Sequence, residues 1–261
     1  MKKVRLYVNT TKVAALTKAS SISKVLQELG YKETSKDEDI VIGFGGDGTL
    51  FRFLKENNYN VSSKYIGVNC GTLGFLQDFD AENVIYFVSN IPNYVEQRLN
   101  FVSLEIEFNG YKKKFYALNE FSVHQAKYKS FKTHVCIAGG HLEDYVGTGI
   151  IFSTSTGSTA LGLSAGGAIL HPSIEAIQMT PREAIVNSKM HSLSKSICLP
   201  KGMDIILTPT SESREISIYS DGEEVYNGLY DSITVSYSER GITKLKKVHD
   251  NFIETIREKL I

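Results

Sequence analysis

The stretch IVIGFGGDGTLFRF, residues Ile40 to Phe53, places four glycines and one aspartate between two apolar runs. The first run has the composition of a buried strand, and the second begins a helix. Glycine lets backbone N–H groups approach a phosphate closely, and a helix N-terminus adds partial positive charge. The stretch therefore predicts a phosphate-binding turn at the carboxyl end of a strand in an open α/β sheet.

Asp47 is the unusual residue of this turn. A carboxylate beside phosphates is electrostatically unfavourable unless it handles a proton or a metal ion. The glycine spacing fits neither GxxxxGK[ST] nor GxGxxG. From the residues alone, Asp47 either takes part in chemistry on a phosphate or caps the helix that follows it.

The composition limits the class of protein. The chain has 261 residues and a formal net charge of zero, so no global basic field attracts nucleic acid or an anionic membrane. Its three cysteines are far apart in the sequence, which argues against a disulfide scaffold or a zinc site and fits a reducing cytosol. The apolar run at the N-terminus is too short for a signal peptide, and no stretch approaches the ~20 apolar residues of a membrane span. We therefore expect a cytoplasmic protein with no nucleic-acid or membrane partner.

Strand and helix signals alternate over the first third of the chain. Val13, Leu16, Ile22, Val25, Leu26 and Leu29 have mostly helical spacing, and Gly30 ends the pattern. Alternating strands and helices imply a parallel sheet with both faces covered. The other elements expected here are strands over 4–8, 39–44 and 64–69, and helices over 50–57 and 81–91, the last capped by Asp80.

The pattern changes near Leu99. Residues 101–125 alternate apolar and polar side chains around Asn109-Gly110, which predicts a hairpin whose YKKK segment is a solvated tip. More strand-like runs follow, interrupted by one predicted helix over 160–170. We therefore expect an α/β domain over 1–98, completed by a terminal helix within 245–261, and a mainly antiparallel, β-rich nucleotide-binding domain over 99–244.

Four stretches carry a resemblance to a known family. GGDGT, Gly45 to Thr49, is similar to the signature shared by NAD kinases, diacylglycerol kinases and sphingosine kinases. Three further stretches resemble NAD kinases in particular and keep that family's order: IGVNCGTLGFL (66–76), ALNEFSV (117–123) and STSTGSTALGLSAGGAILHP (153–172). The resemblance implies phosphoryl transfer from ATP or polyphosphate to the 2′-hydroxyl of the adenosine ribose of NAD, with Mg²⁺ or another divalent cation. It also implies a homodimer or homotetramer.

The resemblance implies roles for individual residues. Asp47 would accept or orient the proton of the ribose 2′-hydroxyl, and no residue is assigned as a metal ligand. The residues expected to bind the nucleotides are Gly45, Gly46, Gly48, Thr49, Arg52, Phe75, Asn119, Glu120, Thr148, Thr156, Thr159, Ala160, Leu161 and Ser164.

Structural alternatives remain open for most of these residues. Asn119-Glu120 either grips ribose hydroxyls or an adenine edge, or is the polar end of a strand. Phe75 either stacks on a base or packs in a core, and Arg52 either neutralises phosphate or makes a surface ion pair. The Ser/Thr-rich block is otherwise a set of turns and caps. We assign structural roles to the histidines considered, which are His124, His134, His171 and His191.

Three positions depart from the family pattern. Thr148 stands where an aspartate is usual, Ser155 where proline is usual, and Leu161 where tyrosine is usual. These changes bear on affinity and substrate preference more than on the class of reaction.

Two alternative functions remain open, which are a lipid kinase of the same superfamily and a non-catalytic NAD(P) sensor. The first is weakened because the chain has no basic amphipathic or lipid-anchoring segment.

Overall fold

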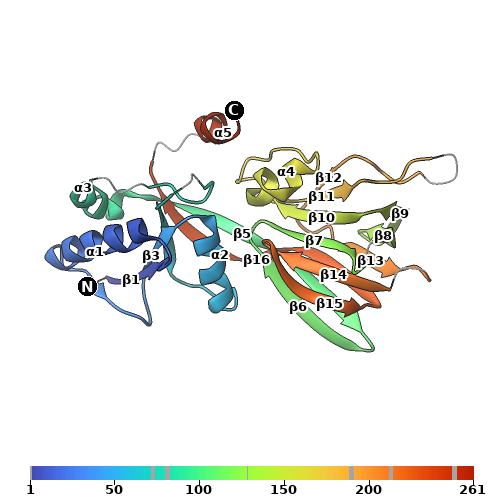
Figure 1. The fold of residues 1–261 in the computed structure, drawn as a ribbon, viewed down its shortest axis with the longest axis horizontal. Coiled ribbons are helices and arrows are strands. Elements are labelled where there is room, and N and C mark those ends of the chain that lie inside the picture. The colour runs from blue at the N-terminus through green and yellow to red at the C-terminus, as the bar shows by residue number, and fades with distance from the viewer. Residues whose placement is uncertain are drawn as a thin grey trace. The chain divides into compact units, whose positions relative to one another are not determined.

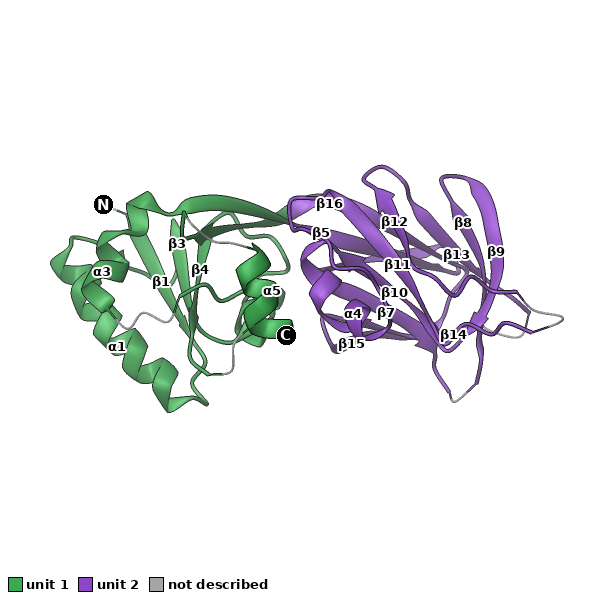
Figure 2. Ribbon diagram, turned by 90° about the horizontal axis from the view of Figure 1, so that it is seen from above, with its two compact units in different colours: residues 1–99, 241–261 green, residues 100–240 purple. Residues whose placement is uncertain are grey.

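The computed structural model describes residues 2–71, 74–79, 83–127, 129–187, 191–211, 214–248 and 252–261. The chain divides into two compact units, which Figure 2 draws in green and purple. Unit 1 comprises residues 1–99 and 241–261, and unit 2 comprises residues 100–240. Each unit is described below by itself.

Unit 1 is built on a parallel sheet (Figure 1). Its strands in order are β2 (Lys32–Glu33), β1 (Lys3–Val8), β3 (Ile40–Gly45), β4 (Lys64–Asn69) and the end of β16 (Ser232–Lys246). Its helices are α1 (Val13–Glu28), α2 (Asp47–Glu56), α3 (Val84–Ser89) and α5 (Phe252–Leu260). Every residue of β3 is buried, as expected for a central strand covered on both faces. The predicted parallel α/β architecture is confirmed.

The predicted helix after Val13 is present, but its buried face differs from the expected one. Ala15, Ala19, Ile22 and Leu26 are buried, while Val13 is 78% exposed. The four buried positions are separated by three or four residues and form a single stripe against the sheet. The small alanines complete that stripe, so the larger apolar side chains at the start of the helix remain in solvent.

The third helix of unit 1 is shorter than predicted. It begins at Val84, and Asn83 caps it by accepting a hydrogen bond from the backbone N–H of Tyr86 at 3.0 Å. A short 3₁₀ helix, η1 (Ile91–Asn93), follows. Asp80, the expected cap, lies outside the described residues.

Unit 2 is antiparallel, which confirms the predicted change of class. One sheet has the order β12 (Ile197–Pro200), β11 (Ala176–Arg182), β10 (Gly149–Thr154), β7 (Glu120–Gln125), β14 (Glu215–Ser220), β15 (Glu223–Leu229). The other strands are β5 (Val95–Phe108), β6 (Tyr111–Ala117), β8 (Phe131–Ile137), β9 (Gly140–Gly147), β13 (Ile205–Pro209) and β16. Side chains from both sets, including Phe121, Phe152 and Leu207, form the core cluster of this unit.

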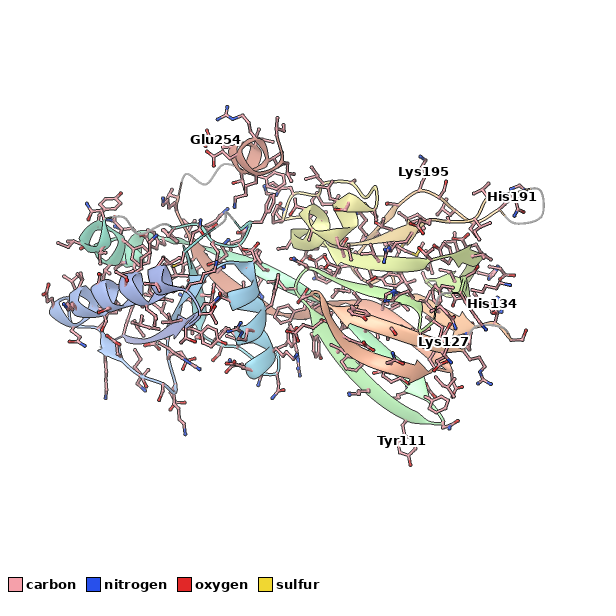
Figure 3. The ribbon with its side chains drawn as sticks, viewed as in Figure 1. Tyr111, Lys127, His134, His191, Lys195 and Glu254 are labelled. Atoms are coloured by element: carbon pink, nitrogen blue, oxygen red, sulfur yellow. The ribbon has the colours of Figure 1, made fainter. Side chains whose placement is uncertain are left out.

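The hairpin predicted at Asn109-Gly110 joins β5 to β6. Both turn residues have positive φ, +49° and +77°, as a two-residue type I′ turn requires. Tyr111, labelled in Figure 3, is 82% exposed beside this turn. The YKKK segment is therefore a solvated tip, as predicted.

The helix predicted over 160–170 is wrong in its length. The chain forms a 3₁₀ turn, η2 (Thr156–Thr159), and a single turn of helix, α4 (Leu161–Ser164). Gly166 then adopts a φ of +88°. Beyond it, the N–H of Ala168 donates to the Gln178 side chain at 2.7 Å and that of Leu170 to the Ser158 hydroxyl at 2.9 Å. These side chains take the donors that a continuing helix would use.

The terminal segment forms α5 and belongs to unit 1. Across the described ranges, none of the helices has the length and apolar character needed to cross a bilayer. Cys70, Cys136 and Cys198 are all free thiols.

The buried stripe of α1 generates a stability prediction. Replacing Ile22, which is fully buried, with alanine removes packed volume and should destabilise unit 1 by about 2–5 kcal/mol. Val13→Ala is the matched control, because that side chain is exposed, and its effect should stay within about 0.5 kcal/mol. Native-state hydrogen exchange of the α1 amides measures both, and equal effects of the two substitutions would contradict the assigned face.

Candidate active site

The glycine turn joins β3 to α2. Gly46 is the extended residue that precedes the helix, and Asp47 is the first helical residue. A Cβ built on Gly46 or Gly48 meets no atom within 4 Å, whereas one on Gly45 would lie 2.0 Å from the Thr49 hydroxyl. The turn is therefore packed at Gly45 and Thr49 and open at Gly46 and Gly48, beside the N-terminus of a helix.

Asp47 does not cap α2, so that structural alternative is wrong. Its carboxylate instead accepts hydrogen bonds from two backbone N–H groups of the segment after β4. Phe75 N–H donates to Oδ2 at 2.8 Å and Leu76 N–H donates to Oδ1 at 3.0 Å. These bonds fix the position and orientation of the carboxylate within unit 1.

Gly74 permits this arrangement and was missed by the sequence analysis. A Cβ on Gly74 would lie 2.1 Å from Asp47 Oδ1, which is far inside van der Waals contact. The signal was present in the sequence, since Gly74 is the second glycine of CGTLGFL. Its meaning depended on a partner 27 positions earlier, which spacing does not reveal.

Phe75 is half-buried rather than a core residue. The ammonium group of Lys259 on α5 lies 4.9 Å from the centre of its ring. The same ammonium donates a hydrogen bond to the backbone carbonyl of Gly74. The terminal helix is thus attached to the segment that holds Asp47. Base stacking by Phe75 stays a prediction.

Arg52 lies one turn and a half along α2, near Tyr7 of β1. Burial first, and then the hydrogen bond that the Tyr7 hydroxyl donates to Glu56, raises the pKa of Tyr7 to about 12, and the charge of Arg52 opposes this rise. Arg52 is exposed. Its predicted contact with phosphate stays a prediction.

In unit 2, Asn119 lies in the connection between β6 and β7, and Glu120 is the first residue of β7. The backbone carbonyl of Asn119 accepts a hydrogen bond from Thr154 N–H at 2.8 Å, and the Thr154 hydroxyl donates to the Leu118 carbonyl at 2.7 Å. A Cβ on Gly157 would lie 2.1 Å from the Asn119 carbonyl oxygen. The η2 turn therefore packs directly against Asn119.

The structure thereby brings several predicted residues together in unit 2. Thr156, Thr159 and Ala160 are half-buried on η2 and at its end, and Ser164 is exposed on α4. Leu161 is 41% exposed, where the family tyrosine would stand. Ser155 is buried, and its hydroxyl donates to the Ile174 carbonyl at 2.5 Å. Serine at this position therefore holds the chain after α4 by a bond that proline could not make.

Glu120 is a buried carboxyl group. It is 6% exposed, and burial first, then the charge of Asp221, raises its pKa to about 8, while a backbone N–H from Leu161 opposes the rise. Within the described part of the chain, its Oε2 atom is buried and has no hydrogen-bond partner. The residue is therefore largely protonated at neutral pH and retains an unsatisfied oxygen next to Leu161.

Thr148 does not lie with the predicted residues around Asn119 and the η2 turn. It precedes β10, while Thr154 ends that strand, so the two lie about 20 Å apart along an extended strand. Its hydroxyl donates to the Arg182 carbonyl at 3.3 Å. Thr148 lines a separate pocket of about 850 Å³, together with residues that include His124, Arg182 and Tyr219. Its role towards the dinucleotide stays a prediction.

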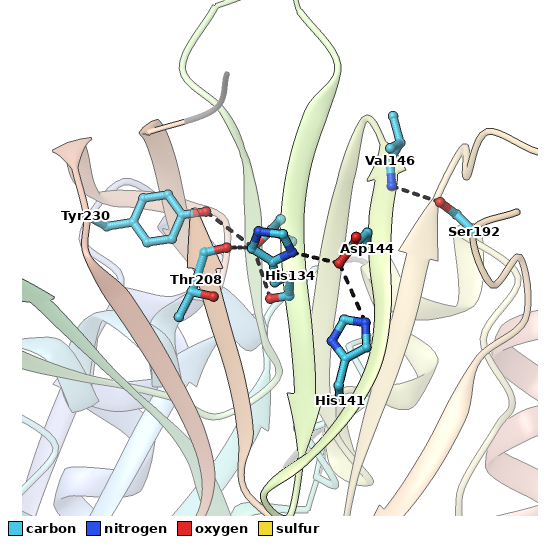
Figure 4. A network of polar contacts seen from close by, with 8 residues as sticks. His134, His141, Asp144, Val146, Ser192, Thr208 and Tyr230 are labelled. Atoms are coloured by element: carbon cyan, nitrogen blue, oxygen red, sulfur yellow. Dashed lines mark hydrogen bonds and ion pairs between the residues drawn. The ribbon is translucent and has the colours of Figure 1, made fainter. Parts of the chain in front are cut away.

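The histidines make local contacts. His134 Nδ1 lies 2.6 Å from Asp144 Oδ1, and His141 Nε2 lies 3.6 Å from the same oxygen, on the surface of β8 and β9 (Figure 4). His171 bonds to Ser173, and the ring of His124 packs edge-on against Tyr219. Among the described residues, no group of three or more His, Cys, Asp or Glu side chains is arranged to hold a metal ion.

Comparison with known proteins assigns the segments around Asp47 and around Asn119 to one family. Residues 118–246 match the family described as "ATP-NAD kinase C-terminal domain". The chain is 32% identical over 263 residues to an NAD kinase of Lactobacillus gasseri, covering 99% of this chain and 97% of that protein. It is 30% identical over 265 residues to an NAD kinase of Staphylococcus aureus strain Newman, covering 94% and 98%.

Two solved structures share the fold. A yeast NADH kinase complexed with NADH aligns with a TM-score of 0.86 at 19% identity and covers 100% of this chain and 87% of its own. An NAD kinase from Archaeoglobus fulgidus in complex with ATP aligns with a TM-score of 0.77 at 21% identity, covering 98% and 99%. From the identity to the bacterial relatives over almost its whole length, the chain belongs to the NAD kinase family.

Proposed function

We propose that this protein is an NAD kinase, which transfers a phosphoryl group from ATP to the 2′-hydroxyl of the adenosine ribose of NAD and forms NADP. Family membership over almost the full chain supports the reaction. The observation in the structure that carries it is the Asp47 carboxylate, fixed by two backbone N–H groups beside an open glycine turn.

Asp47 is suited to act on the ribose hydroxyl. Each carboxylate oxygen accepts one backbone N–H bond and keeps a lone pair for a further partner. A hydroxyl placed there donates its proton to an acceptor whose orientation is already set. Phosphoryl transfer depends mainly on positioning and charge neutralisation, so one oriented carboxylate and a phosphate-binding turn are sufficient protein groups.

The remaining predicted residues bind the nucleotides. Gly45, Gly46, Gly48 and Thr49 present the turn to the donor phosphates, with Arg52 adding positive charge. Asn119 and Glu120, with the segment from Thr156 to Ser164, hold the acceptor. In this assignment of roles, residues 1–98 with 245–261 carry the GGDGT turn and residues 99–244 form the nucleotide-binding domain.

A divalent cation fits this arrangement. Mg²⁺ usually keeps several waters and is held by one or two carboxylates together with substrate phosphates. The turn offers one such carboxylate, Asp47, with a lone pair free on each oxygen. When bound, the ion would neutralise charge on the transferred phosphoryl group.

The family resemblance also supports a cytoplasmic homodimer or homotetramer. Sedimentation equilibrium of the purified protein measures the oligomeric state directly.

An assay of NADP formation tests the proposal. The donor is varied between ATP and polyphosphate, the acceptor between NAD and NADH, and the metal between Mg²⁺ and none. We expect NADP from NAD and ATP. Phosphorylation of diacylglycerol or a sphingoid base in place of NAD would indicate a lipid kinase. Tight NADP binding with no turnover under any donor would indicate a sensor.

Asp47→Asn tests the assignment of the carboxylate. Loss of the proton acceptor should lower kcat by about 10²–10⁴-fold while NAD binding remains measurable by calorimetry. Asp39→Asn is the matched control, because that carboxylate also accepts a backbone N–H, from Lys3 at 2.8 Å, but precedes β3, whereas the turn follows the opposite end of that strand. Turnover of the Asp47 variant within tenfold of wild type would refute the role.

Gly74→Ala tests whether the carboxylate must be held in place. The added methyl group would displace Asp47, so kcat should fall by about tenfold or more while the protein stays folded. Gly71→Ala is the control, because its Cβ meets only the flexible end of Lys12, at 2.6 Å. Equal kcat values for the two variants would argue against this geometry.

A further inference from the structure

Asp221 forms the tip of the β14–β15 hairpin. Asp221 and Gly222 have φ values of +46° and +85°, and they connect the paired residues Ser220 and Glu223. A two-residue turn of this kind favours the sequence Asp-Gly, so a turn is enough to explain the residue type. Its contacts show that Asp221 also binds a segment outside this turn.

The Asp221 carboxylate holds the segment that carries Asn119 and Glu120. It accepts three backbone N–H bonds, from Leu118 at 2.9 Å, from Asn119 at 2.7 Å and from Glu120 at 3.2 Å. In return, Asp221 N–H donates to the Glu120 carbonyl at 3.1 Å. A neutral turn residue such as asparagine has one side-chain acceptor in place of two, so it cannot make the same set of bonds.

The same carboxylate places a charge beside Glu120. Burial of the Asp221 carboxylate raises its pKa to about 6 in spite of its three N–H bonds, so it is ionised above that pH. Its charge is the second cause, after burial, of the raised pKa of Glu120. Glu223 acts on Asp221 from the same hairpin, and the η2–α4 side contributes the Leu161 N–H. Ser153, the partner of Glu120 in β10, is neutral.

We propose that Asp221 is a positioning residue of the nucleotide site, which acts by clamping the backbone of Leu118–Glu120 and by setting a second negative charge beside the Glu120 carboxyl group. The proposal rests on the proposed function, in which Glu120 receives a ribose hydroxyl. Asp221 itself does not need to touch the dinucleotide. It determines where Asn119 and Glu120 point and at which pH Glu120 is ionised.

The sign of the pH effect follows from hydrogen bonding. A ribose hydroxyl donates more strongly to an ionised carboxylate than to a neutral carboxyl group. Below about pH 8 Glu120 must lose a proton to offer that stronger acceptor, so the affinity for NAD should rise with pH and level off above about 8. Without the charge of Asp221, the levelling should begin at a lower pH.

The first experiment is a titration of the free protein by carbon-13 NMR of labelled glutamate side chains. Glu120→Gln assigns the Glu120 signal. In wild type, Glu120 should titrate near pH 8, and in Asp221→Asn it should titrate at a lower pH. Asp231→Asn is the matched control, because Asp231 likewise accepts a hairpin N–H, from Asn109 at 2.7 Å, and should leave the Glu120 titration unchanged.

The second experiment measures NAD affinity by calorimetry from pH 6 to pH 9. Asp221→Asn should weaken the affinity at the plateau by about tenfold or more, since a clamp of charge-assisted bonds is lost, and should move the onset of the plateau to lower pH. A purely structural residue would weaken binding without moving the onset. Asp231→Asn should do neither.

The outcomes separate this proposal from the proposed function. A wild-type Glu120 that titrates as an ordinary glutamate overturns the proposal, and this result is obtained even if Asp221→Asn does not fold. An unmoved onset in a folded Asp221→Asn protein overturns it as well. A wild-type protein that binds no NAD, while Glu120 titrates near pH 8, contradicts the proposed function and leaves the clamp and its charge effect standing.

Discussion

The two hydrogen bonds from Phe75 and Leu76 to the Asp47 carboxylate are the contacts on which the rest of the site depends. They join the first turn of α2 to the segment after β4, so the carboxyl ends of neighbouring strands β3 and β4 share one polar anchor. Burying polar groups is favourable only when they are paired, and here the pairing also orients the acceptor. A glycine at position 74 is the steric condition for this contact.

Unit 2 contains the same type of contact between different elements. A carboxylate on one element accepts backbone N–H groups of another and thereby fixes the position of that second segment. Asp221 does this for Leu118 to Glu120, as Asp47 does for Phe75 and Leu76. Both aspartates are half-buried. Asp221 also influences its neighbour Glu120 through its charge.

Patterns within a short window predicted the elements whose causes are local. Alternation predicted the β5–β6 hairpin, and the strand–glycine–helix order predicted the turn at Asp47. Features decided by distant partners were not predictable. Gln178 of β11 accepts the N–H of Ala168 in the segment after α4, and Asp221 lies about 100 positions from the residues it holds. The turn propensity of Asp-Gly concealed the second role of Asp221, since a turn already explained the residue.

The chain leaves unit 1 after residue 99 and returns to it at residue 241, and this order has a consequence for biosynthesis. Unit 1 receives its last strand from the end of β16, which pairs with β4 through Thr243 and Lys244, and its terminal helix comes later still. All of unit 2 leaves the ribosome before those residues do. The nascent chain thus carries a complete second unit while β4 is still an unpaired sheet edge, which is a surface open to pairing with another strand.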